Sequence, residues 1–170
     1  MSYTVLIAGG FKPPHKGHYD MIKFYLDMDD VKEVILFCGD KKRDEYTLEQ
    51  SEAVFEAYGL LDHPKLTYKR ATVRNGKKGA YTNPLADCFD WAEHNDVNVG
   101  LGWSSKDAGY QSGFMRYFNG ITGVIRPPKF EMKDEISSTE FREALSNGES
   151  IAKFLPNHVD ESQIIELLKG

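Results

Sequence analysis

The amino-acid sequence predicts an α/β fold in which a parallel sheet of five strands carries helices on both faces. Short apolar stretches typical of buried strands alternate along the chain with longer amphipathic stretches typical of helices. This alternation requires crossover connections, which place neighbouring strands parallel to one another. The 170 residues suit a single core, and no internal repeat or long linker divides them. We therefore predict one domain over residues 1–170.

The individual elements follow from the apolar patterning. Strands are expected at Tyr3–Ala8, Val34–Cys38, Leu66–Val73, Val97–Leu101 and Thr122–Ile125. Helices are expected at His18–Met28, Thr47–Tyr58, Pro84–His94, Tyr110–Phe118, Thr139–Leu145 and Glu161–Leu168. Thr47 and Gln50 form a capping box, and Asn83 is expected to cap the helix that begins with Pro84. Because ligands of such sheets bind beyond the carboxyl ends of the strands, the loops after the strands are the place to look for a site.

Composition excludes several classes of protein. A net charge of −5 argues against a nucleic-acid-binding protein, and no apolar run approaches the ~18 residues of a membrane span. No charged stretch followed by an apolar one precedes the first strand, so we expect no signal peptide. Cys38 and Cys88 lack CxxC spacing and lie in a predicted strand and a predicted helix, so we expect buried, reduced thiols. These features favour a cytoplasmic protein.

The segment Gly9-Gly10-Phe11-Lys12-Pro13-Pro14-His15-Lys16-Gly17-His18 joins the first strand to the first helix. Glycines let the backbone turn tightly and approach a ligand, and prolines keep the loop non-helical. His15 and His18 lie where the helix begins, and free N–H groups there favour an anion. We therefore predict a phosphate site in which both histidines donate to phosphate oxygens. Packing histidines are the alternative, and a zinc site would need ligands that no Cys/His cluster supplies.

A second candidate segment, Ile136-Ser137-Ser138-Thr139-Glu140-Phe141-Arg142, opens a helix near the other end of the chain. Ser137, Ser138 and Thr139 make a hydroxyl-rich helix start, which can bind phosphate or simply cap the helix. Arg142 lies about one turn further along and could contact a β- or γ-phosphate through two N–H groups.

The first segment resembles the HxGH signature of the nucleotidyltransferase superfamily, and the second resembles the ISSTxxR motif of the same superfamily. The resemblance covers the chain from Tyr3 to the C-terminal helix. It implies a Rossmann-like fold and transfer of a nucleotidyl group from a nucleoside triphosphate to a small phosphomonoester, with release of pyrophosphate. It also implies Mg²⁺ bridging the triphosphate oxygens, with few direct protein ligands. The nucleotide-binding positions that it implies are Gly9, Gly10, Phe11, Lys12, Gly17, Gly102, Trp103, Ser137, Ser138, Thr139 and Arg142.

A lysine-bearing loop follows the second predicted strand. The stretch from Lys42 to Leu48 resembles the segment of phosphopantetheine adenylyltransferases that carries an essential lysine, and its spacing from His18 matches. With His15 and His18 as the other catalytic residues, we expect Lys42 to bridge the acceptor phosphate and the α-phosphate. Lys41 and Arg43 are the alternatives, and a solvated loop is the other interpretation.

Some positions depart from the family pattern or stay open. Lys12 stands where relatives carry Asp, Asn or Gln, and it could either add charge to the phosphate site or turn outward. Gly10 stands where phosphopantetheine adenylyltransferases carry a hydroxyl residue before the phenylalanine. This difference weakens any transfer of their acceptor specificity to this chain. Trp103 could stack on a base or pack in the core. A further set of basic residues could face an anionic acceptor or be solvated: Lys69, Arg70, Arg74, Lys77 and Lys78.

We interpret the chain as an adenylyltransferase, because the second motif is closer to those of adenylyltransferases than to those of cytidylyltransferases. ATP is therefore favoured over CTP. The alternatives are a cytidylyltransferase acting on a small phosphorylated alcohol and a non-catalytic nucleotide-binding regulator. A fragment of an aminoacyl-tRNA synthetase is disfavoured by the short, acidic chain. Candidate acceptors include nicotinamide mononucleotide, 4′-phosphopantetheine and sugar or polyol phosphates. Relatives range from dimers to hexamers, so a homo-oligomer is among the states expected.

Overall fold

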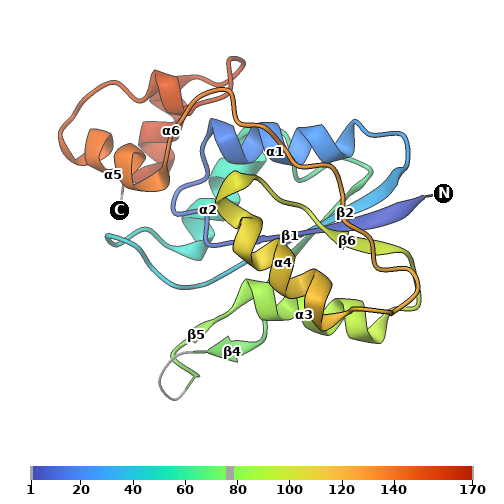
Figure 1. Cartoon of the computed structure of the whole chain (residues 1–170). Helices are drawn as coiled ribbons and strands as arrows, with labels where there is room; N and C mark the ends of the chain where they lie inside the picture. Colours follow the sequence, from blue (N-terminus) through green and yellow to red (C-terminus); the bar gives the residue numbers. More distant parts are fainter. Residues whose placement is uncertain (1, 76–78, 170) are drawn as a thin grey trace.

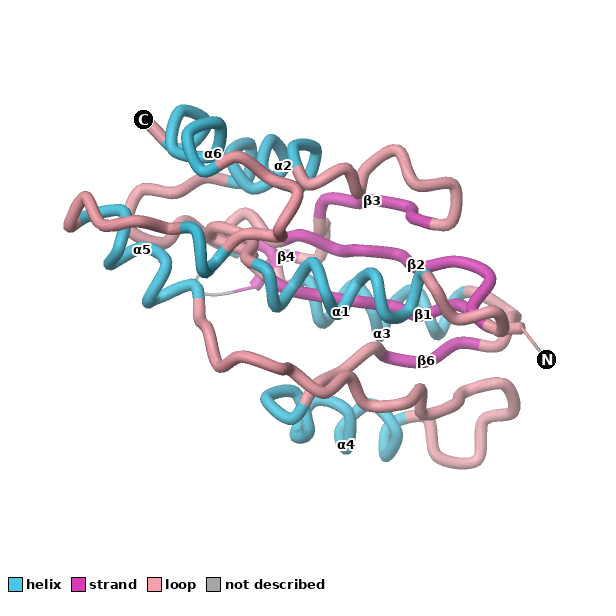
Figure 2. Tube along the Cα trace, turned by 90° about the horizontal axis from the view of Figure 1, so that it is seen from above, coloured by secondary structure: helices cyan, strands magenta, loops and turns pink. Residues whose placement is uncertain are grey.

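The computed structural model describes residues 2–75 and 79–169. Its main sheet contains β1 (Tyr3–Gly9), β2 (Val31–Cys38), β3 (Leu66–Arg70) and β6 (Val99–Leu101). The strands are parallel and run in the order β3-β2-β1-β6, as Figure 2 shows from above. The first strand therefore lies inside the sheet, and its carboxyl end carries the histidine-containing loop into the middle of that edge.

Helices cover both faces of this sheet, as predicted. They are α1 (Lys16–Leu26), α2 (Leu48–Ala57), α3 (Pro84–His94), α4 (Ala108–Tyr117), α5 (Ser138–Ser146) and α6 (Glu161–Leu168). Figure 1 shows α1 above the strands, α3 below them and α4 in front, with α5 and α6 at one end. Short elements complete the chain: β4 (Arg74–Asn75), β5 (Tyr81–Thr82), and the 3₁₀ helices η2 (Ser105–Asp107) and η3 (Ala152–Phe154).

The sheet separates two hydrophobic cores, because successive strand residues point to opposite faces. Val5 and Ile7 of β1 pack with α1, α2, α5 and α6, whereas Leu6 packs with α3 and α4. In β2, Leu36 belongs to the first core and Phe37 to the second. A strand buried on both faces is apolar throughout rather than alternating, which is the pattern that the sequence shows.

The prediction of a fifth strand at Thr122–Ile125 is wrong, and the sheet has four strands. The segment makes one isolated parallel bridge, between Val99 and Val124. Gly123 has φ +96°, and Pro127 and Pro128 follow two residues after Ile125. Because proline has no N–H to donate and Gly123 leaves the extended region, the segment cannot continue a ladder along β6.

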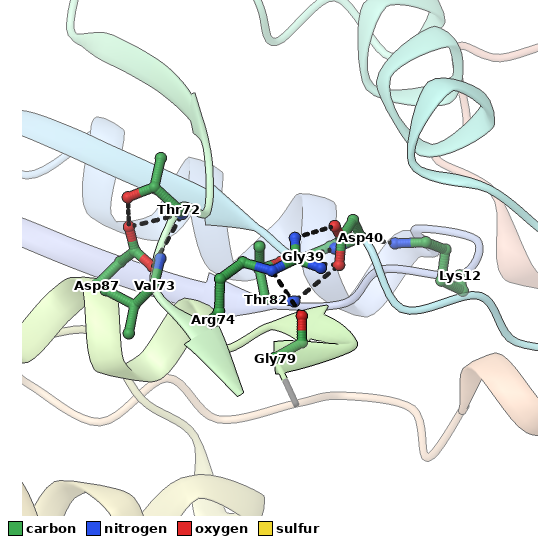
Figure 3. A network of polar contacts seen from close by, with 9 residues as sticks. All are labelled: Lys12, Gly39, Asp40, Thr72, Val73, Arg74, Gly79, Thr82 and Asp87. Atoms are coloured by element: carbon green, nitrogen blue, oxygen red, sulfur yellow. Dashed lines mark hydrogen bonds and ion pairs between the residues drawn. The ribbon is translucent and has the colours of Figure 1, made fainter. Parts of the chain in front are cut away.

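The third strand also ends earlier than the predicted Val73. The backbone N–H groups of Thr72 and Val73 donate to the carboxylate of Asp87 at 3.0–3.1 Å instead of to a neighbouring strand (Figure 3). Asp87 lies in the first turn of α3, so a side chain from the next helix ends the strand. The chain then forms the β4–β5 hairpin, which the sequence did not predict.

Cys38 and Cys88 are both buried and unpaired, as predicted. Burial raises the pKa of each thiol, so neither is a reactive thiolate at neutral pH. Within residues 2–75 and 79–169, no helix has the length and apolarity to cross a membrane.

Candidate active site

A cavity of about 260 Å³ opens at the carboxyl end of β1 and beside the start of α1. Of the residues predicted from the sequence, it is lined by Gly9, Gly10, Phe11, His15, Gly17 and His18. Other lining residues come from the segment after β6, from α4 and from the chain that approaches α5. The cavity therefore lies where the topology of a parallel sheet predicts a ligand.

The two histidines build the helix start themselves. The Nδ1 atom of His15 accepts a hydrogen bond from the N–H of Gly17 at 3.0 Å, and the N–H of His15 donates to Nδ1 of His18 at 3.0 Å. This is a reciprocal capping box made from imidazoles. Since both Nδ1 atoms accept, the proton of each neutral ring is on Nε2, which leaves two Nε2–H donors.

Electrostatics keeps these rings neutral. The rings stack at a centroid distance of 3.7 Å and an interplanar angle of 20°. Burial, followed by the charge of Lys106, lowers the pKa of His15 to about 4. Burial, His15 and Lys106 together hold the pKa of His18 well below its usual range. At neutral pH the pair therefore offers hydrogen-bond donors rather than cations or acids.

Phe11 and two glycines fix the shape of the loop. Phe11 is buried and packs edge-on against His18, with ring centroids 4.8 Å apart. A Cβ atom on Gly9 would lie 2.7 Å from the Phe11 ring, and one on Gly17 would lie 2.8 Å from the His15 ring. These two glycines are therefore required by the aromatic packing that positions the histidines. Gly10, in contrast, faces open space.

Lys12 turns inward, so the outward orientation that the sequence left open is excluded. Its side chain is buried, and Nζ donates to the carbonyl oxygens of Gly10 and Gly39, the latter at 2.7 Å (Figure 3). Burial lowers the pKa of Lys12. The ammonium joins the loop after β1 to the loop after β2, and Lys12 does not line the cavity.

The second motif packs directly on the first. Ser137 caps α5 by accepting from the N–H of Glu140 at 3.1 Å, which is the capping role left open by the sequence. Ser138 Oγ donates to the carbonyl oxygen of Pro13 at 3.0 Å. The two motifs, more than 100 residues apart in the chain, thus form one unit, although Ser137, Ser138 and Thr139 do not line the cavity.

Arg142 completes this unit from the next turn of α5. Its Nη1 donates to the carbonyl oxygen of Lys12 at 2.9 Å, and its Nη2 donates to Thr139 Oγ1 at 3.3 Å. Its Nε donates to the carboxylate of Asp44 at 2.8 Å. A carboxylate therefore occupies part of the guanidinium for which the sequence predicted a phosphate.

Asp44 belongs to the loop that carries Lys42. Arg43 and Tyr46 pair across a tight turn, in which Asp44 and Glu45 have φ values of +47° and +73°. Such values are unfavourable for residues with a Cβ atom, so the turn and the pairing with Arg142 hold the loop in a strained form. Lys42 is exposed on this loop and does not line the cavity. Its bridging role stays a prediction.

Gly102 and Trp103 are not among the residues that line the cavity. Trp103 Nε1 donates to the carbonyl oxygen of Pro127 at 2.8 Å, and the backbone of Trp103 bonds with the hydroxyl of Tyr25. A Cβ atom on Gly102 would lie 2.9 Å from Val5. The packing alternative therefore accounts for Trp103, and close packing against Val5 accounts for a glycine at position 102.

From the segment after β6 only Gly102 and Trp103 were predicted as site residues, and the side chains of η2 were not. Lys106 and Asp107 both line the cavity, and Lys106 Nζ donates to the carbonyl oxygen of Ile136 at 3.2 Å. The carboxylate of Asp107 holds η2 by accepting from the N–H and hydroxyl groups of Ser104 at 3.0 and 3.1 Å. The available signal was position, because these residues follow directly after the carboxyl end of β6.

Two residues of the predicted basic stretch are paired with carboxylates. Arg70 contacts Glu52 at 2.7 Å, and Arg74 contacts Asp40 at 3.0 Å. Thr82 and Arg74 lower the pKa of Asp40 and fix the β4–β5 hairpin on the loop after β2 (Figure 3). Lys77 and Lys78 lie outside the described residues. The solvated-loop interpretation thus fits Arg70 and Arg74 better than an anion-binding role.

The described residues do not fit a protein-held metal site. Nowhere in residues 2–75 and 79–169 do three His, Cys, Asp or Glu side chains converge on a point that could hold an ion. The cavity lining contains one carboxylate, that of Asp107, and Ser104 already donates to it. The Mg²⁺ implied by the motifs is therefore expected to be carried by the triphosphate.

No family model matches the chain. A protein of Vibrio parahaemolyticus described as a nicotinate-nucleotide adenylyltransferase has a similar structure, with a TM-score of 0.63 and 17% identity over 99% of both chains. The Plasmodium falciparum nicotinic acid mononucleotide adenylyltransferase, complexed with APC, has a TM-score of 0.66 and 13% identity over 98% of this chain and 94% of its own.

A bifunctional NMN adenylyltransferase/ADP ribose pyrophosphatase of Francisella tularensis, complexed with AMP and a Mn ion, is similar with a TM-score of 0.63 and 16% identity. The similarity covers 98% of this chain and 48% of that protein, so this chain spans about half its length. At such identities the similarity establishes the fold. It confirms the Rossmann-like α/β fold that the two motifs led us to expect.

Proposed function

We propose that this protein transfers the adenylyl group of ATP to the phosphate of a pyridine mononucleotide and releases pyrophosphate. The observation that carries the proposal is the pair of neutral imidazoles at the start of α1, each with its Nε2–H free of any partner among the described residues. Nicotinate and nicotinamide mononucleotides are the acceptors favoured, because the structurally similar proteins are named for them.

In adenylyl transfer the protein mainly positions the two phosphates and stabilises the charge that develops. A phosphate oxygen of the acceptor attacks the α-phosphorus of ATP and forms the new P–O bond. The bond from that phosphorus to the α,β-bridging oxygen breaks, and its electron pair leaves with pyrophosphate. The acceptor phosphate is already anionic near pH 7, because its second pKa is about 6, so no general base is required. Hydrogen bonds that strengthen as charge develops lower the barrier.

The protein's own groups divide this task. His15 and His18 donate to oxygens of the α-phosphate through Nε2–H, and their neutrality lets them donate without titrating near pH 7. Arg142 holds the distal phosphates once its ion pair with Asp44 is broken. Lys42 contacts the acceptor phosphate and the α-phosphate when its loop moves toward the cavity. Mg²⁺ bound to the triphosphate would neutralise part of its charge, and no protein step depends on a metal ligand.

The test is a substrate panel. ATP or CTP is paired with nicotinate mononucleotide, nicotinamide mononucleotide, 4′-phosphopantetheine or glycerol 3-phosphate, and pyrophosphate release is measured with mass analysis of the product. We expect a dinucleotide from ATP and a pyridine mononucleotide. Turnover with CTP and glycerol 3-phosphate alone would instead make the protein a cytidylyltransferase. Tight ATP binding without pyrophosphate from any pair would make it a non-catalytic binding module.

A further inference from the structure

Lys106 is a cation of the cavity that the two motifs do not include. It lies in η2, directly after the carboxyl end of β6, and its side chain is exposed at the cavity. Among the described lining residues, it alone carries a positive charge at neutral pH. The cationic side chains expected there from the sequence lie elsewhere: Lys12 is buried against carbonyl groups, and Arg142 is paired with Asp44.

Two contacts place Lys106 between the motifs. Its Nζ donates to the carbonyl oxygen of Ile136, the residue before the serine cap of α5, at 3.2 Å. It also shares the cavity wall with His15 and His18, and its charge disfavours protonation of both rings. Within residues 2–75 and 79–169 it forms no ion pair with a carboxylate, so its charge is available to a ligand.

The segment around Lys106 is ordered by its own contacts. The carboxylate of Asp107 accepts from both the N–H and the hydroxyl of Ser104, which fixes the start of η2. The preceding backbone is tied down by Tyr25, whose hydroxyl accepts from the N–H of Trp103 at 3.0 Å. Lys106 is thus presented by a rigid turn, and preorganised donors of this kind are effective on developing charge.

We propose that Lys106 is a catalytic residue whose ammonium donates hydrogen bonds to non-bridging oxygens of the α- and β-phosphates, on the two sides of the bond that breaks. This inference rests on the proposed function. In the proposed function the histidines contact the α-phosphate and Arg142 of α5 holds the distal phosphates, so an ammonium between the two motifs would face the bond that breaks. As that bond breaks, its electron pair moves onto pyrophosphate, and the ammonium stabilises the added charge. The ammonium keeps its proton throughout.

The experiment removes the charge of Lys106 while keeping most of the side-chain length. Lys106→Met removes the ammonium, and Lys106→Gln removes the charge but keeps an N–H group that can donate to the carbonyl of Ile136. Lys32→Met is the matched control, because Lys32 is an exposed lysine of β2 at the opposite, amino end of the sheet. Thermal unfolding of all four proteins shows whether they fold alike.

Two readouts follow. The first is calorimetric affinity for the non-hydrolysable α,β-methylene analogue of ATP, with adenosine as a ligand that has no phosphate. The second is pyrophosphate release with ATP and a pyridine mononucleotide. We expect both Lys106 variants to bind the triphosphate analogue about tenfold more weakly, to bind adenosine normally, and to lower kcat about 100-fold. Lys32→Met should match the wild type in both.

Each result decides something separate. Unchanged affinity for the triphosphate analogue overturns the inference, whatever happens to turnover. Lost affinity with unchanged kcat overturns the role in bond breaking, because the contact would then be equally strong in ground and transition states. If the wild-type protein releases no pyrophosphate from any pair, the proposed function fails, and the affinity comparison alone decides whether Lys106 contacts the phosphates.

Discussion

His15 allows folding and chemistry to be tested separately, because its two ring nitrogens do different things. Nδ1 accepts from the N–H of Gly17 and caps α1, whereas Nε2–H is free to donate to substrate. His15→Asn keeps a good cap, since asparagine is among the preferred N-cap residues, but has no donor at the position of Nε2. His15→Ala loses both functions.

The expected magnitudes differ accordingly. Loss of an N-cap costs about 1 kcal/mol, and in a domain of this length 1 kcal/mol lowers Tm by about 2–4 °C. We therefore expect His15→Ala to melt a few degrees below the wild type and His15→Asn to melt close to it. Loss of one donor to a developing oxyanion costs about 10²–10³ in kcat, so both variants should lose that much.

The assays are calorimetric or fluorimetric melting and pyrophosphate release at saturating ATP. Melting of the wild type in the absence of nucleotide is the reference, because bound ligand raises Tm by mass action. Near-wild-type kcat for His15→Asn would refute the donor role of Nε2. Equal melting temperatures of the alanine and asparagine variants would refute the capping role.

Three further predictions concern Arg142, Lys42 and the pH dependence of stability. Arg142→Ala should raise the KM for ATP and weaken calorimetric binding of ATP much more than of AMP, and equal weakening of both would show that Arg142 does not contact the distal phosphates. Lys42→Ala should lower kcat about 100-fold while leaving the Kd of ATP within a few-fold, and lost affinity with normal turnover would contradict the bridging role. The pKa of His15 is about 4 in the folded protein and about 6.5 in the unfolded chain, so between these values the unfolded chain binds the extra proton. The free energy of unfolding should therefore fall by up to about 3 kcal/mol more in the wild type than in His15→Asn as pH drops from 7 to 4, and denaturant titrations giving the same fall in both would refute this.

The parts of the fold that were predictable are those set by local pattern. Both faces of β1 and β2 are buried, so their residues form continuous apolar runs that any sequence reading finds. The prediction of a fifth strand failed because it relied on the β-branched residues Val124 and Ile125. Gly123 and the later prolines prevent a ladder there. The early end of β3 was not readable, because it depends on Asp87, which comes 14–15 residues after the N–H groups it accepts from.

The features of the site also divide into those that are local in the sequence and those that join distant residues. The histidine pair was predictable because capping, turn and helix start are contiguous in the sequence. The docking of Ser138 on Pro13 and the pairing of Arg142 with Asp44 join residues 125 and 98 positions apart. Lys106 belongs to no local motif, and its place in the cavity wall emerges only when β6 is placed beside β1. Residues brought in by topology therefore need the structure.

The proposed function depends on the neutral imidazole pair at the start of α1, whose Nε2–H groups are proposed to donate to the α-phosphate during adenylyl transfer. Its most direct test is pyrophosphate release from ATP and nicotinate or nicotinamide mononucleotide by the wild type and by His18→Ala. We expect a dinucleotide product from the wild type and a kcat about 100-fold lower for the variant, with ATP affinity changed far less. Equal turnover of the two proteins, or no turnover by the wild type while it binds ATP, would contradict it.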